Sequence, residues 1–212
     1  MNLNFQNTSK QKDIYLKTKR VFDVAFASFC WFVASPVLCT VALAIKVTSP
    51  GPIFYKWKVV GEGGRSFTSY KFRSMYENAD ELKEKLLSQN EMSGPVFKIT
   101  EDPRVTPLGR LLRKCSLDEL PQLWSVMKGD MSLVGPRPPL QSEYEQFSDW
   151  QKQKLCVKPG ITCLWQVCGR NDISDFNEWV RLDLEYIQKR SLKLDLKILL
   201  ETLKCVTNGT GK

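Results

Sequence analysis

The sequence predicts an α+β fold that is mostly helical, in a monotopic membrane protein. Three features predict it: an uncharged apolar segment at residues 24–45, two strand-like runs around a glycine-rich turn, and helical periodicity in much of the remainder. We therefore expect three parts. They are a basic N-terminal tail at 1–18, a re-entrant membrane helix at 19–47, and a cytoplasmic domain at 48–212 that contains one small β-hairpin.

The composition restricts both the partners and the chemistry. The chain carries 31 Lys and Arg against 23 Asp and Glu, and its net charge of +8 favours anionic partners such as phospholipid head groups, phosphorylated substrates or nucleic acid. It has no histidine, which excludes a Ser-His-Asp or Cys-His mechanism and any His-ligated metal within the chain. The 7 cysteines form no C-x-x-C pair, so we expect reduced thiols in a cytoplasmic protein.

The apolar segment is about as long as a helix that spans a bilayer. Ser35-Pro36 lies at its centre, and Pro36 removes the backbone donor to Phe32, so the helix is expected to kink or break there. The Ser35 hydroxyl can satisfy the carbonyl group that loses its donor. This makes a break at Ser35-Pro36 tolerable in lipid.

Charge on both sides of the segment indicates how it is placed. Basic residues precede and follow it: Lys10, Lys12, Lys17, Lys19 and Arg20 on one side, and Lys46, Lys56, Lys58 and Arg65 on the other. Because positive charge favours the cytoplasmic side, a helix-break-helix that enters and leaves the same leaflet keeps both flanks in the cytoplasm. A proline-kinked transmembrane helix and a buried core helix of a soluble protein are the alternatives.

The elements of the cytoplasmic domain follow from periodicity and turn residues. Residues 53–60 and 65–72 are expected to form a hairpin around Gly61-Glu62-Gly63-Gly64. Helices are expected at 77–89, 104–114, 177–188 and 192–206, with a loop at 91–106. The helix at 104–114 is basic and amphipathic, which suits either a head-group surface or packing on the core by its leucines.

Asp118 and Glu119 are adjacent carboxylates at the expected start of a helix. Ser116-Leu117-Asp118-Glu119 matches a capping box, in which Glu119 would only cap the helix. Pro121 fits only a first turn, so the helix starts at Ser116 or slightly later. In either position the helix dipole and Arg113 lower the pKa of both acids, while their mutual repulsion raises the pKa of one. A pair split in this way suits a nucleophile beside a proton acceptor.

Asp118 is a candidate nucleophile on phosphorus, because aspartate can form aspartyl-phosphate intermediates. A Mg²⁺ ion held by Asp118 and by substrate phosphates would let one anion approach another. Arg113 and Arg137 can bind phosphate oxygens bidentately. Pro136 and Pro138 stiffen the backbone on either side of Arg137 and help to aim its guanidinium.

Two further sets of residues are candidates for binding. Lys71 and Arg73 form a second basic site that would meet a phosphate if it folds against the first, with an exposed strand end as the alternative. Trp165 and Gln166, together with Arg170, can offer an aromatic face and polar donors to a nucleobase. A single Trp lies more often in a core, which is the alternative for Trp165.

These residues together resemble the bacterial sugar transferases of the monotopic phosphoglycosyl transferase family, and they correspond to its catalytic core alone. The resemblance rests on an ordered set of motifs that covers nearly the whole chain. They are Lys19-Arg20-Val21-Phe22-Asp23, Ser35-Pro36, Ser49-Pro50-Gly51-Pro52, Lys71-Phe72-Arg73-Ser74-Met75, Asp102-Pro103-Arg104-Val105-Thr106, the segments 116–123 and 129–138, Lys158-Pro159-Gly160-Ile161-Thr162 and Leu164-Trp165-Gln166-Val167.

The resemblance implies an enzyme that transfers a sugar 1-phosphate from a UDP-sugar to polyprenyl (undecaprenyl) phosphate and releases UMP. This would be the first membrane step of exopolysaccharide, capsule, O-antigen or glycoprotein glycan assembly. It implies that Asp118 becomes a sugar-phosphoryl aspartate and helps to bind Mg²⁺, that Glu119 assists as a base, and that Arg113 and Arg137 hold phosphate.

The resemblance also implies a location. The helix broken at Ser35-Pro36 would lie in the phospholipid of the bacterial inner membrane, with the catalytic domain on the cytoplasmic face. Nucleic acid is not an expected partner, and a homodimer is left open.

Two other functions fit the charge alone: a membrane-anchored module without chemistry that binds anionic lipid, and a nucleic-acid binder. The Asp118-Glu119 pair disfavours both, because two carboxylates repel phosphate unless a cation intervenes.

Overall fold

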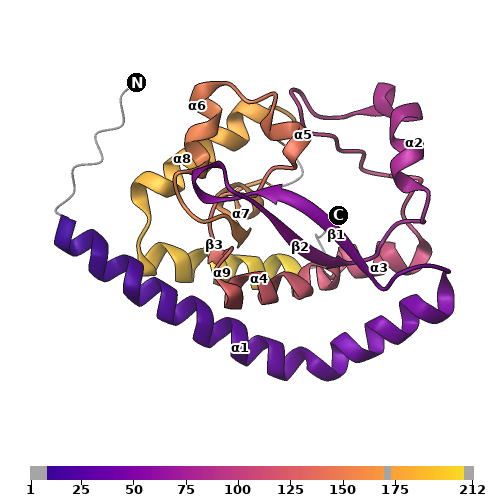
Figure 1. Cartoon of the computed structure of the whole chain (residues 1–212), viewed down its shortest axis with the longest axis horizontal. Coiled ribbons are helices and arrows are strands. Elements are labelled where there is room, and N and C mark those ends of the chain that lie inside the picture. Colours follow the sequence, from indigo (N-terminus) through magenta and orange to yellow (C-terminus); the bar gives the residue numbers. More distant parts are fainter. Residues whose placement is uncertain (1–8, 170–172, 208–212) are drawn as a thin grey trace.

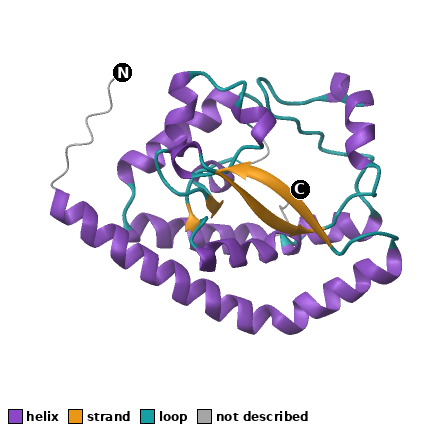
Figure 2. Ribbon diagram, viewed as in Figure 1, coloured by secondary structure: helices purple, strands orange, loops and turns teal. Residues whose placement is uncertain are grey.

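The computed structural model describes residues 9–169 and 173–207. Within them the protein is mostly helical, with one antiparallel hairpin and one short parallel strand pair (Figure 2). The long helix α1 (Ser9–Thr48) runs along one side of the molecule, and the other elements lie on one side of it (Figure 1). The predicted mostly helical α+β class is confirmed.

The remaining helices are α2 (Ala79–Lys85), α3 (Pro107–Lys114), α4 (Leu123–Lys128), α5 (Gln141–Tyr144), α6 (Asp149–Lys152), α7 (Leu164–Val167), α8 (Phe176–Lys189) and α9 (Leu192–Thr207). Short 3₁₀ helices are η1 (Glu62–Gly64), η2 (Leu87–Gln89), η3 (Leu117–Gln122) and η4 (Gln153–Leu155). The hairpin consists of β1 (Phe54–Val60) and β2 (Ser66–Phe72), and β3 (Ser132–Val134) pairs in parallel with β4 (Gly160–Thr162).

The predicted hairpin and the two C-terminal helices are confirmed to within a residue at each end. The helix expected at 77–89 is divided into α2 and η2, and the helix expected at 104–114 begins only at Pro107, where Thr106 caps it by accepting the Gly109 backbone N–H at 2.9 Å. The helix expected to start at Ser116 or slightly later is present as η3 followed by α4, whereas α5 to α7, β3 and β4 were not among the predicted elements.

Helix α1 is continuous through Pro36 and also takes in residues 9–18 of the predicted tail. Figure 1 shows it bent rather than broken. The Ser35 hydroxyl donates to the Phe32 carbonyl at 2.7 Å, the oxygen that Pro36 leaves without its backbone donor. The expected role of Ser35 is therefore confirmed, but the predicted helix-break-helix is wrong, because this bond lets one bent helix continue.

Helix α1 leaves much of its apolar surface exposed. Phe29, Phe32 and Val47 are 65%, 80% and 76% exposed. Among the described residues, Asp13–Thr48 is the one segment long and apolar enough, by length and composition, to cross a membrane, and 11% of its most apolar window is buried in the protein. A core helix of a soluble protein would bury that surface, so this alternative does not fit.

The N-terminal half of α1 is attached to the rest of the protein by polar contacts. Lys19 Nζ lies 2.9 Å from Asp195 Oδ2 of α9, and the Ser132 hydroxyl of β3 donates to the Asp23 carboxylate at 2.7 Å. Arg20 donates to two carbonyls of α4 at 2.6 and 2.9 Å. These contacts fix the apolar helix against α4, α9 and β3.

Three apolar clusters hold the elements together. The main one joins α1, α4, β3, α8 and α9, and the others lie around α7 and α8 and between the end of α1, β2 and α3. Representative buried residues are Ala27, Val126, Val134, Tyr186 and Ile198 in the first, Trp165 and Trp179 in the second, and Ile45, Phe72 and Leu112 in the third.

The backbone just after β3 is held by two glycines. The Gly135 N–H donates to the Thr162 carbonyl at 3.0 Å, and the Gly160 N–H donates to the Pro136 carbonyl at 2.9 Å. A Cβ on Gly160 would lie 2.1 Å from the Gly135 nitrogen, so only glycine permits this approach. The contact fixes where the chain leaves β3 and so where Arg137 begins.

Candidate functional site: an acid pair among three cations

Asp118 and Glu119 lie in the first turn of η3, immediately before α4. Ser116 has a left-handed backbone with φ 53° and makes no side-chain cap bond, so the predicted capping box is wrong. The carboxylates do lie at the start of a helix, but that helix is a 3₁₀ turn. The alternative in which Glu119 only caps its own helix is thereby removed.

The Glu119 carboxylate instead meets a lysine from the hairpin. Lys71 Nζ of β2 lies 2.5 Å from Glu119 Oε1 and 4.3 Å from the centroid of the Trp57 ring. Burial lowers the pKa of the Lys71 ammonium and the charge of Arg137 lowers it further, while Glu119 and Asp118 raise it. Lys71 therefore folds against the acid pair, which is the condition stated for its role in phosphate binding, and the alternative of an exposed strand end does not hold for it.

Asp118 is buried, with 8% of its surface exposed. The Arg113 guanidinium from α3 acts on it electrostatically, because Asp118 is the largest influence that raises the pKa of Arg113 against the lowering by burial. Arg113 Nε donates to the Ser74 hydroxyl at 3.0 Å, which fixes the direction of the guanidinium. The structure thus brings together Asp118 and Arg113, as the sequence predicts.

Arg137 belongs to the same charge cluster, since its field lowers the pKa of Lys71. Lys71 and Arg113 thus interact with both carboxylates, and Arg137 adds a third positive charge that acts on Lys71. An excess of cations at a buried carboxylate suits an anionic ligand such as a diphosphate, because guanidinium groups can bind phosphate oxygens in pairs.

Arg73 lies elsewhere, although the sequence places it beside Lys71. Its guanidinium donates to the carbonyls of Ser49 and Pro50 and to the Ser49 hydroxyl, the latter at 2.7 Å. Strand β2 ends at Phe72, so the alternation that would put residues 71 and 73 on one face ends there too. The expectation that Arg73 binds phosphate disagrees with this geometry, in which Arg73 holds the turn after α1.

The predicted nucleobase platform is not present as a surface. Trp165 is buried and stacks on Trp179 with ring centroids 4.0 Å apart, so the core alternative holds. Gln166 Oε1 accepts the Cys163 backbone N–H at 3.0 Å and caps α7. Arg170 lies outside the described residues.

A magnesium ion can be tested against the donors that are present. Within residues 9–169 and 173–207 there is no group of three or more His, Cys, Asp or Glu that could hold a metal. Mg²⁺ is commonly bound by one or two carboxylates together with waters and substrate phosphates. Asp118 fits as the protein ligand of a Mg²⁺ ion that arrives with a phosphorylated substrate.

Some residues that shape the site were not singled out from the sequence. The hairpin pairs Tyr55 with Lys71, which makes Trp57 the diagonal neighbour of Lys71, so the register would have indicated this contact. Lys154 of η4 and Asp183 of α8 form an almost fully buried pair with 2.5 Å between Nζ and Oδ2. Burial raises the pKa of Asp183, and Lys154 and the Arg137 backbone N–H oppose that rise. No local pattern pairs residues 154 and 183.

The lowered pKa of Lys71 gives a pH prediction. In the folded protein the Lys71 ammonium should lose its proton at a pH below its ordinary pKa of 10.5. Above that lowered pKa, Glu119 no longer has a cationic partner, although the chain is still folded. Between the lowered pKa of folded Lys71 and 10.5 the unfolded chain binds more protons than the folded protein, so the free energy of unfolding should rise with pH.

We expect enzymatic activity to fall on the alkaline side at a pH below 10.5. Lys71→Arg should move that fall to higher pH, since Arg stays charged. A pH–rate profile of both proteins measures it, and identical alkaline limbs would contradict it.

Comparison with known proteins supplies the family. The model of the bacterial sugar transferase family matches residues 14–209. The galactosyl transferase CpsE of Streptococcus agalactiae is 47% identical, over 93% of this chain and 44% of its own length. The undecaprenyl-phosphate galactose phosphotransferase of Salmonella typhimurium is 42% identical, over 97% of this chain and 43% of its own. The exopolysaccharide production protein ExoY of Sinorhizobium fredii is 38% identical, over 97% and 92%.

The chain thus spans less than half the length of the first two relatives and nearly all of the third. Since the family match covers nearly the whole chain, this protein belongs to the bacterial sugar transferase family.

Proposed function

We propose that this protein transfers a sugar 1-phosphate from a UDP-sugar to polyprenyl phosphate and releases UMP. The observation that carries the proposal is the buried Asp118 beside Glu119, with Lys71 of β2 paired to Glu119 and with Arg113 of α3 acting on both carboxylates. The name of the Salmonella relative supports a polyprenyl phosphate as acceptor.

In the first half-reaction an Asp118 carboxylate oxygen attacks the phosphorus that bears the sugar. The bond from that phosphorus to the bridging oxygen breaks, and UMP leaves with that oxygen. Arg113 and Arg137 hold the phosphate oxygens while negative charge moves from the carboxylate to UMP. The burial of Asp118 limits access of water to the acyl phosphate that forms.

In the second half-reaction an oxygen of polyprenyl phosphate attacks the same phosphorus. The bond between phosphorus and Asp118 breaks, which restores the carboxylate and yields a polyprenyl diphosphate sugar. Glu119 accepts the proton of the incoming phosphate, and Lys71 holds Glu119 in place through their ion pair. When bound, Mg²⁺ would neutralise diphosphate charge, with Asp118 as its protein ligand.

Helix α1 is proposed to lie in the bacterial inner membrane, entering and leaving the cytoplasmic leaflet. Its exposed apolar surface supports contact with lipid, and the bend of this helix, which contains Pro36, supports a return to the same side. The site would then lie at the cytoplasmic face, where a membrane-bound acceptor presents its phosphate.

The direct test is UMP release by the detergent-solubilised protein from a panel of UDP-sugars, with Mg²⁺ and undecaprenyl phosphate. We expect lipid-dependent UMP from at least one sugar, and loss of it on chelation with recovery on adding Mg²⁺. A non-catalytic module that binds anionic lipid would bind undecaprenyl phosphate without any UMP release, and that result would replace the proposal.

Glu119→Gln should separate the two half-reactions. Without the base we expect a normal first burst of UMP from UDP-sugar alone, and turnover with lipid lowered by about 10²-fold or more. Rapid-quench measurement of UMP with and without undecaprenyl phosphate distinguishes them. Equal loss of the burst and of turnover would show that Glu119 does not act in the second step alone.

The membrane topology can be tested with an impermeant thiol reagent. Asp13→Cys puts a thiol on the N-terminal part of α1, and the native Cys156 is exposed in the cytoplasmic domain. A re-entrant helix predicts that both react from the same face of sealed membrane vesicles. A transmembrane helix predicts reaction from opposite faces, and that result would overturn the re-entrant placement.

A further inference from the structure

A pocket of about 150 Å³ lies next to the acid pair and is not used by the steps above. It is enclosed by η3, β4, α7 and the C-terminal part of α9. Its walls are mostly apolar and include Leu120, Ile161, Val167 and Val206, with the half-buried thiol of Cys205 on α9.

One side of this pocket is formed by a residue of the acid pair. Glu119 lines the pocket and also forms the 2.5 Å ion pair with Lys71. A ligand with a phosphate beside Lys71 and Glu119 would therefore place the atoms next to that phosphate in an apolar space. This combination suits an anion that carries a hydrocarbon chain.

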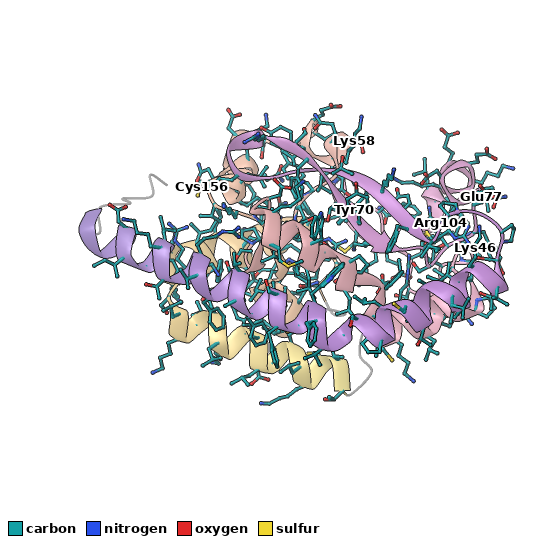
Figure 3. The ribbon with its side chains drawn as sticks, turned by 60° about the horizontal axis from the view of Figure 1, so that its bottom comes forward. Lys46, Lys58, Tyr70, Glu77, Arg104 and Cys156 are labelled. Carbon is teal, nitrogen blue, oxygen red and sulfur yellow. The ribbon has the colours of Figure 1, made fainter. Side chains whose placement is uncertain are left out.

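The other wall leads to an apolar surface. Thr202, Cys205 and Val206 line the pocket, whereas Leu200 and Leu203 of the same helix are more than half exposed on its outer side. Figure 3 shows α9 alongside α1 on the face that comes forward. The pocket thus lies between the acid pair and the side of the molecule where both helices expose apolar residues.

We infer that this pocket holds the isoprene unit next to the phosphate of the lipid acceptor. The inference rests on the proposed function and adds a subsite to it. An apolar cavity of about 150 Å³ is large enough for a benzene molecule, so a five-carbon isoprene unit fits the volume. The phosphate then lies at Lys71 and Glu119, and the rest of the chain continues towards the apolar outer side of α9.

A bulky side chain that fills the pocket should weaken binding of undecaprenyl phosphate without affecting the first half-reaction. Val206→Trp places an indole in the pocket, and we expect the KM for undecaprenyl phosphate to rise by about tenfold or more while the UMP burst without lipid stays normal. Asp149→Trp, at a fully exposed position on α6 that lines neither the pocket nor the outer side of α9, is the control and should leave the KM unchanged. An unchanged KM in Val206→Trp, with a normal burst to show that it is folded, would overturn the inference.

Protection of Cys205 gives a readout that does not depend on turnover. The wild-type protein is treated with a methanethiosulfonate reagent, and modification of each cysteine is followed by peptide mass mapping. We expect undecaprenyl phosphate in detergent micelles to slow modification of Cys205 at least about fivefold, and inorganic phosphate to have no effect, because the chain and not the phosphate occupies the pocket. The exposed Cys156 is the internal control and should react equally in all samples.

The experiments distinguish failure of the pocket assignment from failure of the proposed function. Normal lipid-dependent UMP release without protection of Cys205, or equal protection by inorganic phosphate, would overturn the pocket assignment and leave the proposed function intact. Absence of UMP release from every UDP-sugar would overturn the proposed function whatever happens at Cys205.

Discussion

Asp118→Asn should lower UMP release from UDP-sugar by about 10³-fold or more, both in the first burst and in turnover. The carboxamide keeps the size of the side chain but cannot attack phosphorus as an anion. Because Asp118 is buried and interacts electrostatically with Arg113, the loss of its charge also leaves that guanidinium without this carboxylate. The burst is measured by rapid quench with radiolabelled UDP-sugar.

The matched control is Asp149→Asn, which changes a fully exposed aspartate at the start of α6 and should leave the burst unchanged. Near-ultraviolet circular dichroism of both variants reports whether the fold is kept. If folded Asp118→Asn released UMP at the normal rate, the covalent mechanism would be wrong.

Lys154→Met should destabilise the protein by about 3–5 kcal/mol, because it leaves the Asp183 carboxylate buried without its cation. Lys154 and Asp183 are almost fully buried, so water cannot replace the lost partner. Urea unfolding of the detergent-solubilised protein measures the change, provided that the slope with denaturant stays the same.

Two companion variants sharpen this prediction. Lys154→Met combined with Asp183→Leu should recover much of the lost stability, since no unpaired charge remains. Lys189→Met breaks the exposed pair of Lys189 with Glu185 on the same helix and should cost less than about 1 kcal/mol. If Lys154→Met lowered the free energy of unfolding no more than Lys189→Met does, the ion pair of Lys154 with Asp183 would not stabilise the fold as predicted.

Local patterns were sufficient for the elements that are long or flanked by clear turns. The hairpin follows from two runs of strand-forming residues around glycines, and Ser35 was expected to satisfy the Phe32 carbonyl because Pro36 is one residue away. The strands β3 and β4 have three residues each, too few for a period to be seen. Their pairing depends on the contact of Gly135 with Gly160, which no local window contains.

The candidate site was predicted best where its residues are close in sequence, and less well where distant segments compete for a side chain. Asp118, Glu119 and Arg113 lie near one another in the chain and in the fold. The capping box was wrong, and the Glu119 carboxylate pairs with Lys71 of β2 instead. The position of Arg73 was not predicted, because its guanidinium donates to backbone carbonyls in the turn at Ser49 and Pro50. Such choices depend on tertiary contacts, which sequence spacing does not encode.

The most direct test of the account is to locate the covalent intermediate. The protein is incubated with UDP-sugar and no lipid, treated with hydroxylamine, digested and mapped by mass spectrometry. Because hydroxylamine converts an acyl phosphate to a hydroxamate, we predict a hydroxamate at Asp118 that appears only when UDP-sugar is present. A hydroxamate at another residue, or none in a protein that releases a burst of UMP, would contradict the account.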